Sequence, residues 1–103
     1  MSKNKISVTS NNSYAQTLFE LASESNVLSE IEKQVNSILV LIKNSKDFSY
    51  LIKNPTTRSK DLIKVMEMIS EKNNHNELLK RFISFIIKKR RFFYVEKIFK
   101  DFL

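Results

Sequence analysis

The stretch SYAQTLFELASES, residues 13–25, has the spacing of an amphipathic helix. Its apolar residues recur at intervals of three and four, which places them on one side of a helix. At about 100° per residue they nevertheless span an arc of about 160°, whereas a surface helix of a small bundle needs little more than about 100°. The stretch therefore predicts a helix with more apolar surface than one buried face uses.

A second stretch, LLKRFISFIIKK at residues 78–89, has the same layout and an arc of about 200°. Two explanations are open. A helix at the centre of a bundle is covered on several sides, so that the whole arc is core. Alternatively, the two helices lie side by side and their outer flanks line a groove for another amphipathic helix, which would be held by anchors spaced three, four and seven residues apart.

The groove explanation makes a separate prediction for each flank. The flank through Ala15, Phe19 and Ala22 is expected to pack into the bundle. The flanks expected to line the groove comprise Tyr14, Leu18 and Leu21 together with Leu78, Phe82 and Phe85.

Composition favours an all-α domain. The 103 residues are enough for one domain with one core, and they include no glycine, no cysteine and a single proline, Pro55. Phosphate-binding loops and tight hairpin turns depend on glycine, so dinucleotide folds, P-loop folds and hairpin-rich sheets are disfavoured. Without cysteine, packing alone must hold the fold.

The rest of the chain divides into helix-sized segments at asparagines, which tolerate the left-handed conformation at helix ends better than other non-glycine residues. Asn26, Asn44, Asn54 and the pair 73–74 are the expected stops. A compact six-helix bundle is predicted, after a flexible leader at residues 1–12. The expected helices cover residues 13–25, 28–43, 46–53, 57 or 59 to 72, 76–89 and 92–103. The longest of them, 28–43, is expected to span the bundle.

Charge is concentrated in the second half of the chain. Residues 1–51 carry five lysines and five acids, whereas residues 52–103 carry thirteen bases and six acids, which accounts for the net charge of +7. The densest cluster, KKRR at residues 88–91, raises the alternative of a small basic helical domain that binds nucleic acid. Four consecutive helical residues point in widely different directions, however, so they cannot form one basic face. A patch together with the nearby bases stays possible, because phosphate binding needs charge but little geometry; these bases are Lys80, Arg81, Lys97 and Lys100.

No catalytic, cofactor or metal site is predicted. His75 is the only histidine and stands in the polar segment NNHNE, where a polar loop residue is the expected role. The carboxylates are scattered, and no nucleophile has an adjacent base. The longest apolar run, residues 38–42, is far short of the roughly 20 residues that a membrane span needs.

Three segments, which together extend over residues 13–103, resemble one family. YAQTLFELA at residues 14–22 is similar to the YAxALFELA opening of the delta subunit of bacterial F-type ATP synthase, known in mitochondria as the oligomycin-sensitivity-conferring protein. LIKNPT at residues 51–56 resembles that family's LxNPxI segment. The third match, residues 82–102, holds an apolar pair, a basic turn at residues 89–92, and then Ile98 and Phe102.

The resemblance implies a non-catalytic stator module without a cofactor. Such a six-helix N-terminal domain sits on the catalytic hexamer, where its first and fifth helices receive the N-terminal helix of an alpha subunit and hold the head against rotation. It implies a monomeric domain, peripheral to the cytoplasmic face of the bacterial inner membrane, that binds no nucleic acid. The positions matching the family's contact residues are Tyr14, Thr17, Leu18, Phe82, Phe85 and Ile86.

Some positions depart from the family pattern. Thr17 stands where alanine is favoured, Arg58 where a serine helix cap is common, and Arg90 where a turn glycine is usual. The sequence ends at Leu103, whereas the family continues with a C-terminal domain that contacts the b subunits of the peripheral stalk. We expect that contact to be missing from this chain.

Overall fold

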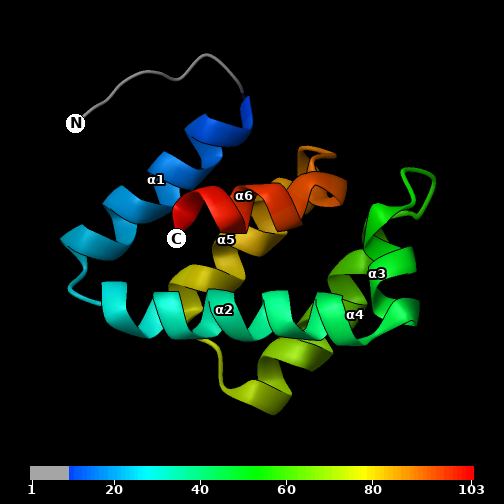
Figure 1. The fold of residues 1–103 in the computed structure, drawn as a ribbon, viewed down its shortest axis with the longest axis horizontal. Helices are drawn as coiled ribbons and strands as arrows, with labels where there is room; N and C mark the ends of the chain where they lie inside the picture. Colours follow the sequence, from blue (N-terminus) through cyan, green and yellow to red (C-terminus); the bar gives the residue numbers. More distant parts are fainter. Residues whose placement is uncertain (1–9) are drawn as a thin grey trace.

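The computed structural model describes residues 10–103, and within that range it contains six α-helices, one 3₁₀ turn and no strand (Figure 1). The prediction of an all-α six-helix bundle is confirmed. The elements are α1 (Ser10–Glu24), α2 (Leu28–Asn44), α3 (Lys46–Lys53), α4 (Ser59–Asn73), α5 (Glu77–Lys88), η1 (Phe92–Tyr94) and α6 (Val95–Phe102).

The observed helix boundaries differ from the predicted ones by three residues or fewer. The first helix begins at Ser10 rather than at residue 13, so the last part of the expected leader is helical. Residues 1–9, the rest of that leader, lie outside the described residues. The expected helix 92–103 is a 3₁₀ turn followed by α6.

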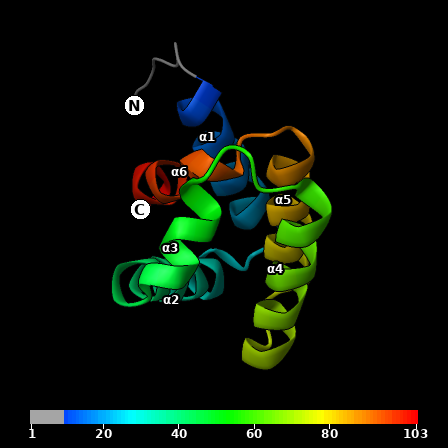
Figure 2. The same ribbon diagram turned by 90° about the vertical axis from the view of Figure 1, so that its right-hand side faces the viewer.

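The helices pack around α6, which lies between α1 and α2. α2 extends along the long dimension of the molecule, with α1 above one of its ends and α3 at the other (Figure 1). α4 and α5 lie against each other on the far side (Figure 2). α6 contacts both α1 and α2, and it buries four of its eight residues in the core, Val95, Ile98, Phe99 and Phe102.

α5 is covered on more than one side, because it packs against α1, α4 and η1. Its buried residues lie all along its apolar arc: Leu79, Phe82, Ile83, Ile86 and Ile87. The explanation of a centrally placed helix therefore accounts for most of the arc of α5. Leu78 and Phe85, at one edge of the arc, remain partly or largely exposed.

Three helices end in turns that hold a residue with positive φ, namely Asn26 (60°), Asn74 (52°) and Arg90 (60°). In each turn, the amide of the next residue donates to a carbonyl five residues back, which satisfies a carbonyl that the helix end leaves unpaired. The expectation is thus confirmed for Asn26 and for the pair 73–74. Arg90 adopts the same conformation in the place of the family's glycine.

Helices also end at Asn44 and Asn54, as expected, but neither residue takes the left-handed conformation. Asn44 is the last residue of α2, and the extended Ser45 that follows accepts a hydrogen bond from the amide of Phe48 (3.1 Å), which starts α3. Asn54 is itself extended, as the residue before Pro55 must be.

His75 is buried, which corrects the expectation of a polar loop residue. The turn after α4 folds its side chain inward, where Nδ1 lies 3.0 Å from the hydroxyl of Ser70 and Nε2 has no hydrogen-bond partner. The same turn is fastened to α2, because the amide of Asn76 donates to Oε1 of Gln34 at 2.8 Å. Burial, followed by the charge of Lys80, lowers the pKa of His75 below its ordinary value of 6.5.

One ion-pair network connects α3 to α6. The carboxylate of Glu96 lies 3.1 Å from the ammonium of Lys53 and 3.4 Å from that of Lys100. The hydrogen bond from Lys53 is the main cause that lowers the pKa of Glu96, against the opposing effect of burial. These groups are half exposed, so their contribution to stability is small.

We expect Arg90→Gly to stabilise the fold. A side chain in the left-handed conformation costs about 1–2 kcal/mol, and glycine removes that cost while losing part of the gain to its more flexible unfolded state. The free energy of unfolding in urea should rise by about 0.5–1 kcal/mol. Lys89→Gly is the matched control, because Lys89 has right-handed helical angles, so glycine should lower stability there. A loss of stability in Arg90→Gly would contradict this account.

Stability should fall as the pH decreases from 7.5 to 5. The pKa of His75 is lower in the folded state, so the unfolded chain takes up the proton first once the pH drops below about 6.5. The slope cannot exceed about 1.4 kcal/mol per pH unit for one group. The pKa of Glu96 lies below its ordinary value of 4.5 in the folded state, so this group contributes only at the acid end of the window. Urea unfolding at several pH values should show the slope in the wild type and not in His75→Gln; an equal slope in both would exclude His75 as its source.

Candidate functional site

α1 and α5, which hold the residues predicted for the groove, are neighbours in the fold. They run in roughly opposite directions, so that the start of α1 lies near the end of α5 (Figures 1 and 2). The rings of Tyr14 and Phe85 meet there edge to face, with centroids 6.0 Å apart and planes at 68°. Such aromatic pairs prefer this geometry, and it fixes the two helices against each other at this point.

Five of the eight predicted site residues are accessible. Leu21 is 39% exposed and Phe85 45%, although both are large apolar side chains. Thr17 is also exposed, while Tyr14 and Leu78 are half-buried. We call these five residues, Tyr14, Thr17, Leu21, Leu78 and Phe85, the α1–α5 surface.

The other three predicted site residues, Leu18, Phe82 and Ile86, belong to the core. Leu18 and Ile86 are fully buried and Phe82 is 5% exposed. They lie toward the middle of each apolar arc rather than at its edge, so the packing of the two helices covers them. They support the α1–α5 surface from beneath and are not themselves available for contact.

Phe19 was expected to pack into the bundle and is instead 45% exposed. Ala15 and Ala22 on the same flank are buried as expected. Phe19 lies at the edge of the apolar arc of α1, where its ring makes an edge contact with that of Phe102 at the end of α6, with centroids 6.3 Å apart. The matching position on α5, Ile83, is buried because α5 has α4 on that side.

A cation stands over the α1–α5 surface at Phe85. The ammonium of Lys89 lies 5.6 Å from the centre of the Phe85 ring, within the range of a cation–π interaction. The sequence interpretation did not include Lys89 among the site residues. Its spacing of four from Phe85 on a helix was the available signal.

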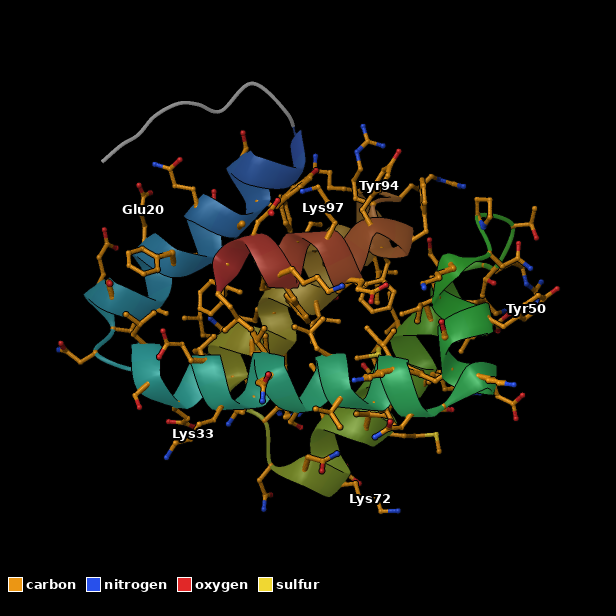
Figure 3. All side chains as sticks on the ribbon, viewed as in Figure 1. Glu20, Lys33, Tyr50, Lys72, Tyr94 and Lys97 are labelled. Carbon is orange, nitrogen blue, oxygen red and sulfur yellow. The ribbon has the colours of Figure 1, made fainter. Side chains whose placement is uncertain are left out.

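The basic cluster at residues 88–91 forms no single face. α5 ends at Lys88, Arg90 is in the left-handed turn, and Arg91 is half-buried while the other three bases of the cluster are exposed. Some exposed apolar side chains lie on other helices. Tyr50, for example, is 74% exposed and points outward from α3 (Figure 3).

A cleft between α4 and α5 has a volume of about 420 Å³. Its lining mixes apolar side chains such as Ile63 with charged ones such as Glu67 and Lys80, and it includes Ser70, whose hydroxyl is hydrogen-bonded to the buried His75. Among residues 10–103, no histidine and acid side chains gather in a group that could hold a metal ion. No helix in that part of the chain is long and apolar enough to cross a bilayer.

Comparison with known proteins agrees with this architecture. Residues 11–103 match the family model described as ATP synthase delta (OSCP) subunit. The chain is 52% identical to the ATP synthase subunit delta of Pelagibacter ubique, over all of this chain and 56% of that protein. It is 34% identical to the chloroplastic ATP synthase subunit delta of Galdieria sulphuraria, over 87% of this chain and 50% of that protein.

A further relative, the ATP synthase subunit delta of Mesorhizobium japonicum, is 30% identical over 86% of this chain and 48% of that protein. The chain thus spans about half the length of the curated relatives it matches. No solved structure matches it significantly. The match over nearly all described residues, together with the six-helix fold, shows that this chain belongs to the ATP synthase delta (OSCP) subunit family.

Proposed function

We propose that this chain is a non-catalytic stator module of an F-type ATP synthase, and that the α1–α5 surface binds the N-terminal helix of an alpha subunit. Through that contact it holds the catalytic head against rotation while ATP is made. Membership of the delta subunit family supports the stator role. It acts as a peripheral part of the complex on the cytoplasmic face of a bacterial membrane.

The observation that carries the binding proposal is an apolar strip left uncovered on two adjacent helices. On α1, Tyr14, Thr17 and Leu21 have the spacing i, i+3 and i+7, which places them along one edge. On α5, Leu78 and Phe85 form a matching edge two turns long. A helix lying between these edges would present anchors with the same spacing, as in other helix-in-groove complexes.

The buried residues beneath the strip suit it to a mechanical role. Leu18, Phe82 and Ile86 are packed in the core and so hold the exposed anchors in place. The edge contact of Tyr14 with Phe85 joins the exposed edge of α1 directly to that of α5. We call these two edges the α1 wall and the α5 wall of the surface. A preformed surface loses little conformational entropy on binding, which favours an affinity high enough to resist torque.

The alternative of a nucleic-acid-binding domain finds no support. The bases at residues 88–91 do not share a face, and several others are paired within the described residues, such as Lys97 with Asp101 at 3.2 Å. The family match points to a different role.

Titration with a peptide of the cognate alpha-subunit N-terminus tests the proposal. We expect amide shift changes concentrated on α1 and α5, at Tyr14, Thr17, Leu21, Leu78 and Phe85 and at the core residues directly beneath them. Changes concentrated on α2, α3 or α4, or no binding at all, would overturn the proposal.

Phe85→Ala should weaken binding of the same peptide by about 1–3 kcal/mol, as truncation of a central aromatic anchor does. Calorimetric titration measures the change. Tyr50→Ala is the matched control, because Tyr50 is an exposed aromatic residue on α3, away from α1 and α5, and its removal should leave affinity unchanged. Equal losses in the two variants would argue against a role for the α1–α5 surface.

A further inference from the structure

We propose that the α1–α5 surface selects a helix with acidic residues along one side of its apolar stripe, namely the side that faces α5. The inference rests on the proposed function and adds the charge pattern of the partner. It comes from the opposite charge of the two walls of the surface.

The α5 wall is basic. Arg81, Lys88 and Lys89 all lie within about 60° of Phe85 around the helix axis. All three are exposed, and Lys89 extends over the Phe85 ring. A ligand that covers Phe85 must therefore come close to these cations.

Two of these cations have no acidic partner in the part of the chain that the structure describes. Within residues 10–103, neither Lys88 nor Lys89 forms an ion pair, and Arg81 has only a long contact of 3.7 Å with the exposed Glu77. Their ammonium groups are thus available to a partner. An acid brought beside them would also be close to the partly dehydrated Phe85 ring, where charge interactions are stronger than in free solvent.

The α1 wall is different. α1, SNNSYAQTLFELASE, contains no lysine or arginine, and its two charged residues are Glu20 and Glu24. Both are exposed, and Glu20 projects outward from the helix (Figure 3). Acids on the side of the partner that faces α1 would meet no cation of α1 itself. The walls therefore distinguish the two sides of a bound helix.

Charge at such a surface acts mainly on partner choice and orientation. A helix with acids on the α5 side is attracted, and one with bases there is repelled. The apolar anchors supply the remaining affinity, so binding should persist, more weakly, without the acids.

Peptides based on the cognate alpha N-terminal segment test this inference. In each peptide, two positions beside the apolar stripe are set to Glu, Gln or Lys. The two positions are seven residues apart, which matches the separation of Arg81 and Lys88. One series changes one flank of the stripe, and a second series changes the other flank. On one flank only, the Glu peptide should bind about fivefold more tightly than the Gln peptide at low salt, and the Lys peptide more weakly than both. The difference should shrink to less than about twofold in 0.5 M salt.

A matched pair of double variants locates the effect. Lys88→Gln with Lys89→Gln should abolish most of the preference for Glu. Lys60→Gln with Lys64→Gln removes the same charge from exposed positions of α4 and should leave the preference intact. Thermal unfolding of both variants checks that the fold is retained.

The outcomes separate the inference from the proposed function. Equal binding of the Glu, Gln and Lys peptides, or equal preference for Glu on both flanks, overturns the charge selection while the stator role stands. Failure of every peptide to bind overturns both. Loss of the preference in the Lys60 and Lys64 variant would show a general effect of net charge and would also overturn the inference.

Discussion

The packing of α6 between α1 and α2 is the interaction on which the rest of the structure depends. α6 has only eight residues and would not be helical alone, since isolated helices of that length are unstable in water. Half of its residues are buried, and Ile98 and Phe99 are fully so. Because α6 is the main neighbour of α1, it determines which flank of α1 faces the core and which remains outside. The position of α1 next to α5, and hence the α1–α5 surface, follows from this contact.

The absence of glycine places a second constraint on the fold. Sharp reversals after α1, α4 and α5 must be made by Asn26, Asn74 and Arg90, each at a conformational cost. The tertiary contacts beyond each turn repay that cost. After Asn74, for example, His75 packs inside and Asn76 bonds to Gln34 of α2, which sets the start of α5. The start of α5 then fixes where Leu78 and Phe85 emerge beside α1.

The wide apolar arcs of α1 and α5 have two causes at once. Their middle is core, because each helix packs against several others, while one edge of the α5 arc and both edges of the α1 arc are exposed. The same position in the two patterns can be buried or exposed: Ile83 is buried where α5 packs on α4, whereas Phe19, beside the ring of Phe102, is 45% exposed. Arc width therefore indicates surplus apolar surface, while the neighbours decide where the surplus lies. The α5 wall carries bases and the α1 wall carries acids. This charge difference makes the two sides of the apolar strip unlike, so that it can distinguish the two sides of a bound helix.

The sequence by itself determined the helices, because their signals are local: apolar spacing, the Ser45 cap, Pro55 after Asn54, and asparagines able to take positive φ. It also named the two helices that carry the surplus apolar residues, and the five accessible members of the candidate site. Only the tertiary structure decided that Leu18, Phe82 and Ile86 are core, that Phe19 is exposed and that His75 is buried. Burial is a property of what lies across from a residue, and those neighbours come from distant parts of the chain that helical periodicity does not describe.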